Sequence, residues 1–129
     1  MIEFGRIVVL VKDYENALRF YQNVLGCSVI YDGKTDDGKR LLHLGFGLTD
    51  KAGLWLMKAE NDEQGKLIGN QAGNQPFLVL YTDGLDIYKK NFAENRVKIL
   101  KEPNSGEDYK FMHFEDLYGN EIVLVEMEK

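Results

Sequence analysis

The feature of this sequence that most constrains its fold is a weak internal repeat with a spacing of 70 residues. When each residue is laid over the one 70 positions later, Asp13 meets Asp83 and His43 meets His113 without a gap. Other matches join residues of similar chemistry: Val9 with Val79, Leu10 with Leu80, Arg40 with Lys110, and Leu54 with Leu124. The shared hydrophobic pattern favours a duplicated structural unit, so the chain should fold as two similar halves.

Each half shows the same order of predicted elements, a strand, a helix and three more strands. Asp13 and Asp83 follow the first strands, where a carboxylate can cap the N-terminus of a helix. The first helix should end at Gly26, which tolerates a left-handed conformation, and the second at Asn95. The strands are expected at residues 7–11, 29–31, 40–46 and 54–57, and at 77–81, 97–100, 110–115 and 122–127.

The halves are separated by a polar segment, residues 59–75, which is rich in glycine and asparagine and offers only Leu67 and Ile68 for burial. We interpret it as a linker that is long enough to be mobile or to form an active-site lid. The sequence therefore predicts one α+β domain, with a first module at 1–58 and a second at 76–129.

The composition restricts the possible functions. Its 129 residues are 44% hydrophobic and 29% charged, which is typical of one globular domain. The net charge of −5, with basic residues scattered among acidic ones, argues against nucleic acid as a partner. No apolar run is long enough for a membrane span or a signal peptide, and the single cysteine, Cys27, suits a reducing compartment. We therefore expect a cytoplasmic protein in which Cys27 is buried and not nucleophilic.

Three segments together resemble the vicinal oxygen chelate superfamily, which includes glyoxalases, bleomycin-resistance proteins and extradiol dioxygenases. They are VKDYENALRFYQNVLGCSV, FLVLYTDGLDIYKKNF and FEDLYGNEIVLVE, the last with Leu117 where the family usually has proline. The resemblance implies two tandem βαβββ modules whose curled mixed sheets surround a cleft, usually within a homodimer.

In metal-dependent members of that family, histidine, glutamine or glutamate projects from the first and fourth strands of each module. The corresponding positions here are Arg6, Pro76 or Phe77, Gly53 or Trp55, and Val123. None of these side chains coordinates a divalent cation, so we expect no metal of the family type and no cofactor. His43 and His113 remain weak candidates for catalysis, although two half-buried histidines with local hydrogen bonds are the favoured interpretation.

A cleft without a metal can still bind a planar or cationic molecule. The favoured hypothesis is a small-molecule-binding protein of the glyoxalase/bleomycin-resistance type. The alternatives are a lyase, isomerase or dioxygenase with a divergent active site, or a structural partner module. A homodimer is also expected, because a lone module leaves sheet face and edges exposed. The residues expected to line the cleft are Arg6, Phe46, Trp55, Tyr81, Phe111, His113 and Tyr118.

Overall fold

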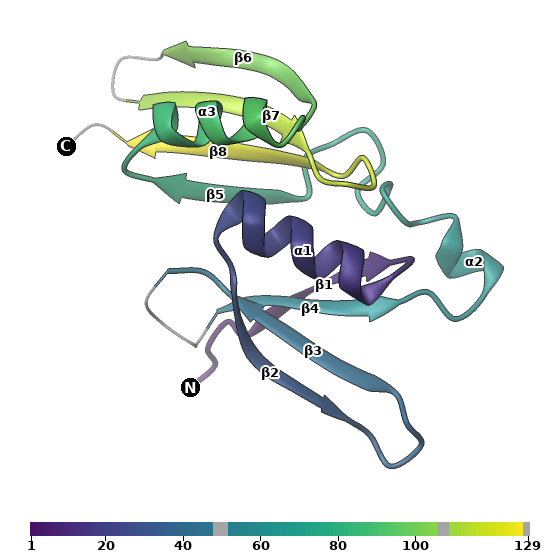
Figure 1. Ribbon diagram of the computed structural model, residues 1–129. Helices are drawn as coiled ribbons and strands as arrows, with labels where there is room; N and C mark the ends of the chain where they lie inside the picture. Colours follow the sequence, from purple (N-terminus) through teal and green to yellow (C-terminus); the bar gives the residue numbers. More distant parts are fainter. Residues whose placement is uncertain (48–51, 106–108, 128–129) are drawn as a thin grey trace. The chain divides into compact units, whose positions relative to one another are not determined.

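The chain folds into two compact units, Met1–Ile68 and Gly69–Lys129, each with the order strand, helix, strand, strand, strand (Figure 1). The computed structural model describes residues 1–47, 52–105 and 109–127. Each unit contains one four-stranded mixed sheet. The predicted α+β class with two tandem βαβββ modules is therefore confirmed. No helix within the described ranges is long and apolar enough to cross a membrane.

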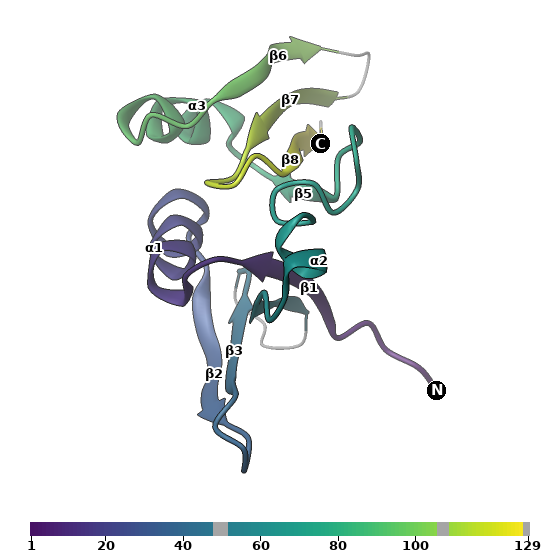
Figure 2. The same ribbon diagram turned by 90° about the vertical axis from the view of Figure 1, so that its right-hand side faces the viewer.

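The first unit has its strands in the order β1-β4-β3-β2, with β1 parallel to β4 and the other pairs antiparallel. The helix α1 covers one face of this sheet and buries Tyr21 and Val24 there (Figures 1 and 2). Leu42 and Leu54 are fully buried on the sheet. The elements are β1 (Arg6–Val11), α1 (Tyr14–Leu25), β2 (Ser28–Lys34), β3 (Arg40–Gly45) and β4 (Gly53–Lys58).

The second unit repeats this arrangement with the strand order β5-β8-β7-β6, and β5 is parallel to β8. Phe92 of the helix packs on Phe114 of the sheet, with ring centroids 4.3 Å apart, and both side chains are fully buried. The elements are β5 (Leu78–Thr82), α3 (Leu85–Glu94), β6 (Ile99–Ser105), β7 (Tyr109–Glu115) and β8 (Glu121–Met127).

The strand register shows that the two halves are not related by one constant spacing. Ile7 pairs with Leu54, and Leu78 pairs with Ile122, so the first strands are equivalent at a spacing of 71 and the fourth strands at 68. The second and third strands keep the spacing of 70, at which Tyr31 matches Lys101 and His43 matches His113. The predicted matches of Val9 with Val79 and Leu54 with Leu124 are therefore wrong in register, although the duplication is real.

The helix ends follow the corrected register. Asp13 caps α1, since its Oδ1 accepts hydrogen bonds from the amides of Glu15 at 2.7 Å and Asn16 at 3.1 Å. Gly26 ends α1 in the left-handed conformation at φ 72°, as predicted.

The prediction that Asp83 caps the second helix is wrong. The cap residue is Gly84, which makes no side-chain cap and lies 71 residues after Asp13. Glu126 of β8 takes over part of the role, because its Oε1 accepts from the amide of Leu85 at 2.9 Å. Asn95 ends α3 as expected.

The segment expected to be a linker is divided between the units. A short helix, α2 (Asp62–Gly65), is capped by Asn61 and belongs to the first unit. Gly69 begins the second unit at φ 75°, and a Cβ on it would lie 1.9 Å from the carbonyl oxygen of Tyr118. This close approach leaves no room for a Cβ, so position 69 requires a glycine. The mobility and lid role of residues 59–75 stay predictions.

The contrast between the two aspartates gives a test of the capping analysis. Asp13→Ala should lower the free energy of unfolding by about 0.5–2 kcal/mol, because the amides of Glu15 and Asn16 lose their acceptor. Asp83→Ala is the matched control and should change stability by less than about 0.5 kcal/mol, since Asp83 is exposed and caps nothing. Urea denaturation measures both; equal losses would contradict the assignment.

Candidate functional site

The candidate site lies on the sheet faces opposite the helices, which we call the open faces. Successive side chains of a strand point to opposite faces, so the residues that alternate with the buried core residues lie on the open face. In β8, for example, Ile122 and Leu124 are buried in the core, whereas Val123 and Val125 point the other way. Each unit therefore has one face covered by its helix and one face that its helix leaves uncovered.

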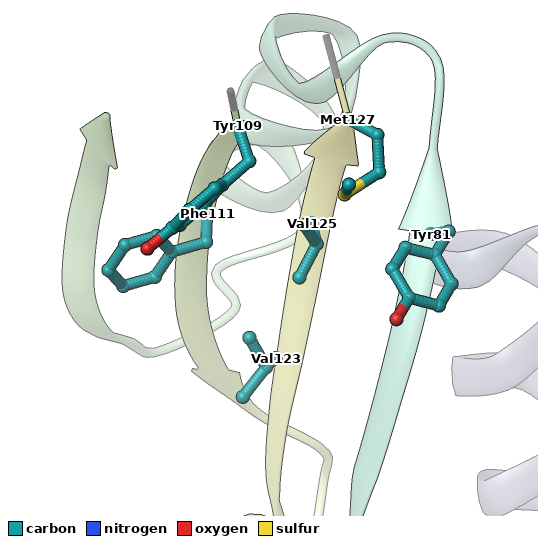
Figure 3. A pocket seen from close by; sticks show the side chains of 6 residues that line it. All are labelled: Tyr81, Tyr109, Phe111, Val123, Val125 and Met127. Atoms are coloured by element: carbon teal, nitrogen blue, oxygen red, sulfur yellow. The ribbon is translucent and has the colours of Figure 1, made fainter. Parts of the chain in front are cut away.

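The open face of the second sheet carries an apolar hollow of about 370 Å³ (Figure 3). Tyr81 stands at its edge with 73% of its surface exposed, and the rings of Tyr109 and Phe111 lie 5.7 Å apart on β7. All three rings present flat apolar surface, and the two tyrosines also carry a polar hydroxyl tip. The residues that line the hollow are Tyr81, Tyr109, Phe111, Val123, Val125 and Met127.

A histidine–carboxylate pair lies next to the hollow. Nδ1 of His113 on β7 is 2.6 Å from Oε2 of Glu121 on β8. His113 stands opposite Val123 in the β7–β8 ladder, and its ring is 5.7 Å from that of Phe111. The partner of His113 could not be predicted from the sequence, because a diagonal cross-strand contact depends on the register.

The open face of the first sheet carries an aromatic cluster. His43 lies between Tyr31 and Trp55, at ring-centroid distances of 5.9 Å and 4.9 Å. Within the described residues, Nε2 of His43 and Nε1 of Trp55 are enclosed and have no hydrogen-bond partner. Enclosure away from water lowers the pKa of His43, and the charge of Arg6 lowers it further. Both effects act against the protonated form of His43.

The predicted cleft residues are divided among several places. Tyr81 and Phe111 come together in the hollow, and His113 stands beside Phe111. Phe46 follows β3 and is half-buried. Tyr118 is half-buried in the turn before β8, where its backbone contacts Gly69, and it does not line the hollow. Alternation along β8 was the signal that could have identified Val125 and Met127 in advance.

The turn before β8 is built on a buried aspartate. Asp116 accepts hydrogen bonds from the backbone amides of Tyr118 at 2.9 Å and Asn120 at 3.0 Å, and its second oxygen accepts from the Asn120 side chain at 2.9 Å. Gly119 completes the turn at φ 99°. These contacts explain why the segment FEDLYGNEIVLVE has aspartate, glycine and asparagine at these spacings. They also fix the turn after which β8 begins at Glu121.

A second, polar hollow of about 440 Å³ in the first unit is a poorer candidate. The guanidinium of Arg40, which lines this hollow, is bound by Asp32 at 2.9 Å and by Glu15 at 2.6 Å, and it lies over the ring of Tyr14. The guanidinium is thus neutralised within the chain. Cys27 is buried as expected, and burial raises the pKa of its thiol to about 12, which keeps it unreactive at neutral pH.

The register also locates the positions at which the family resemblance implies metal ligands. Trp55 and Val123 are equivalent, since they stand opposite His43 and His113, and Phe77 lies 71 residues after Arg6. No side chain of this set is a ligand for a divalent cation. Across the described ranges, no three His, Cys, Asp or Glu side chains gather closely enough to hold a metal ion.

The electrostatics of His43 can be tested directly, because the chain has only two histidines. In an NMR titration, the His43 imidazole, assigned with His43→Gln, should have a midpoint below the ordinary value of about 6.5. Arg6→Gln should raise this midpoint, and the control Arg19→Gln on α1 should not. Because the pKa of His43 is lowered in the folded state, its contribution to the free energy of unfolding is fully present above about pH 6.5. This contribution is lost as the pH falls below that value. A midpoint at or above 6.5 would contradict this account.

Comparisons with solved structures and curated sequences agree with this architecture. The structure of UcmS2 matches with a TM-score of 0.82 and 20% identity, covering 97% of this chain and 98% of that one. TnmS3, an antibiotic binding protein from Streptomyces sp. CB03234, matches with a TM-score of 0.78 and 23% identity, covering 99% of this chain and 98% of that one. At these identities the likeness shows the fold.

Two curated sequences, together with a family pattern, identify the family of this chain. An uncharacterized protein of Shewanella frigidimarina (strain NCIMB 400) is 33% identical over 115 residues, which cover 88% of this chain and 85% of the relative. The mitochondrial methylmalonyl-CoA epimerase of Bos taurus is 28% identical over 97% of this chain and 73% of its own length. The family pattern matches residues 3–124, nearly the whole of both units. The chain therefore belongs to the Glyoxalase/Bleomycin resistance protein/Dioxygenase superfamily.

Proposed function

We propose that this protein binds a small, flat, largely apolar molecule and does so without a metal ion. The observation that carries the proposal is the hollow on the second sheet, where aromatic and aliphatic side chains lie exposed. Tyr81 and Met127, which both line the hollow, are 73% and 52% exposed, and apolar side chains grouped in one exposed patch can mark a binding surface. Concave surfaces of this composition are typical of small-molecule sites.

The residues at the family's metal positions also support binding over metal-dependent catalysis. Arg6, Trp55, Phe77 and Val123 supply one cation and three apolar groups where a Lewis acid would need ligands. The named antibiotic binding protein with the same fold gives a precedent for this use of the scaffold. The predicted cytoplasmic location belongs to the same proposal, supported by the single, buried cysteine.

The second candidate is an isomerase, which the identity to a methylmalonyl-CoA epimerase favours. Such an enzyme would have to use a divergent site, and the histidines on the two open faces, His43 and His113, are the groups able to transfer protons there. A lyase or dioxygenase would place the same demand on these two residues.

We also propose that the protein is a homodimer. Val79 on the open face of β5 lies outside the hollow and is 52% exposed, and β5 is an edge strand of its sheet. An exposed edge beside apolar side chains is a surface on which proteins associate. A two-fold axis would cover the same patch on both copies.

Binding can be tested with a matched pair of variants. A thermal-shift panel of flat aromatic and cationic compounds should include ligands that stabilise the protein, by about 2.7 kcal/mol at 100 times Kd. Tyr81→Ala should weaken such a ligand about tenfold, because the ring leaves the hollow. Ile87→Ala on α3 is the control, since Ile87 is 74% exposed, against 73% for Tyr81, but lies outside the hollow. The outcome against binding is a panel with no stabiliser, together with a stoichiometric metal that is lost in His43→Gln or His113→Gln.

The dimer can be tested by light scattering at micromolar concentration. The mass should be near twice the 14.8 kDa of one chain. Val79→Glu should shift the mass toward 14.8 kDa, because a charge on this exposed edge opposes an apolar contact, whereas Ile87→Glu should leave it unchanged. A wild-type mass near 14.8 kDa would refute the dimer.

A further inference from the structure

A pair of polar side chains at the border of the apolar hollow should favour some classes of ligand over others. His113 and Glu121 lie on the open face of the second sheet, with side chains 20% and 24% exposed. Their contact is a short hydrogen bond of 2.6 Å between Nδ1 and Oε2. It is diagonal in the β7–β8 ladder, because His113 stands opposite Val123 and Glu121 stands opposite Glu115.

The carboxylate fixes which nitrogen of the ring carries the proton. An ionised glutamate only accepts hydrogen bonds, so neutral His113 must place its proton on Nδ1 and donate it to Glu121. Nε2 then carries a lone pair and is an acceptor. In the part of the chain that the structure describes, no residue hydrogen-bonds Nε2 of His113, and this atom is not among the enclosed ones.

The imidazole is within reach of a molecule that lies in the hollow. The ring of Phe111, which lines the hollow, is 5.7 Å from the ring of His113 in an edge-on arrangement. Val123, also in the lining, is the direct cross-strand neighbour of His113. A ligand resting on Phe111 and Val123 would therefore have one edge at the imidazole of His113.

The charge of the pair decides between ligand classes. An acceptor nitrogen favours a ligand edge that donates a hydrogen bond, such as a hydroxyl. The carboxylate of Glu121 disfavours a ligand that brings a negative charge to the same place. Glu115, opposite Glu121 in the ladder, adds to that disfavour.

Building on the proposed function, we infer that the His113–Glu121 pair selects flat aromatic ligands with a hydroxyl group, as in a phenol or an enol, and that the hydroxyl donates its hydrogen bond to Nε2 of His113. The hollow supplies the apolar contact area, and the pair supplies the discrimination. A buried or half-buried hydrogen bond of this kind separates ligands with a donor from isosteres without one.

The test compares 2-naphthol, 2-methoxynaphthalene and 2-naphthoate by titration calorimetry at neutral pH. Wild-type protein should bind 2-naphthol about tenfold more tightly than 2-methoxynaphthalene, which has the same rings but no donor. It should bind 2-naphthoate the least tightly of the three. His113→Phe should abolish the preference for the hydroxyl and keep the affinity for the methoxy compound, because the phenyl ring retains the apolar contact.

Glu121→Gln tests the pair without removing the imidazole. The amide can either donate to Nδ1 or accept from it, so the ring proton is no longer held on Nδ1 and the preference for 2-naphthol should shrink. Glu115→Gln is the matched control, since it removes one negative charge nearby but not the carboxylate bound to His113, and the preference should persist. If His113→Phe fails to fold, Glu121→Gln with this control carries the comparison.

The outcomes separate this inference from the proposed function. Equal binding of 2-naphthol and 2-methoxynaphthalene by the wild-type protein would overturn the inference and leave small-molecule binding standing. A preference for the hydroxyl that survives in both His113→Phe and Glu121→Gln would also overturn it. Failure of all three probes to bind would count against the inference and against the proposed hollow together.

Discussion

The structure depends on the parallel pairing of the first and last strand in each unit, β1 with β4 and β5 with β8. A parallel pair cannot be closed by a tight turn, so the chain must cross over before it returns to the sheet. Here the crossover includes a helix that packs on one face, buries Tyr21 in the first unit and Phe92 in the second, and leaves the other face open. The core and the candidate site are the two consequences of this one arrangement.

The asymmetry between the two units shows how a duplicated fold tolerates divergence. The first helix is capped locally by Asp13, whereas the second relies on Glu126, a residue 41 positions away in the last strand. The cap of α3 is thus a tertiary contact that forms only when β8 is in place beside it. Both solutions satisfy orphan backbone amides, which is the physical requirement that the fold imposes.

The candidate site combines apolar surface with a few polar groups whose states the fold controls. Enclosure and the charge of Arg6 lower the pKa of His43, and His113 is oriented by its hydrogen bond with Glu121. At the positions where the family resemblance implies metal ligands, the chain presents an arginine, a tryptophan, a phenylalanine and a valine. Under the proposed function, such residues would recognise a ligand by shape and hydrogen bonding.

The sequence by itself determined the fold class, the duplication, the order of the elements and the cap and stop of the first helix. These properties depend on local periodicity, on Asp13 and Gly26, and on motifs such as the turn built on Asp116, all of which are readable along the chain. The exact register of the halves was not readable, because the spacing changes from 71 to 68 along the repeat and a gapless overlay hides such shifts.

Only the tertiary structure decided which side chains meet. Glu121 reaches His113, and Glu126 reaches Leu85, through cross-strand or strand–helix contacts. The hollow likewise gathers residues from β5, β7 and β8, which lie up to 46 positions apart, between Tyr81 and Met127. Side-chain alternation determines the face of each residue, but the neighbours on that face are fixed by strand order and register, which single-sequence patterns do not contain.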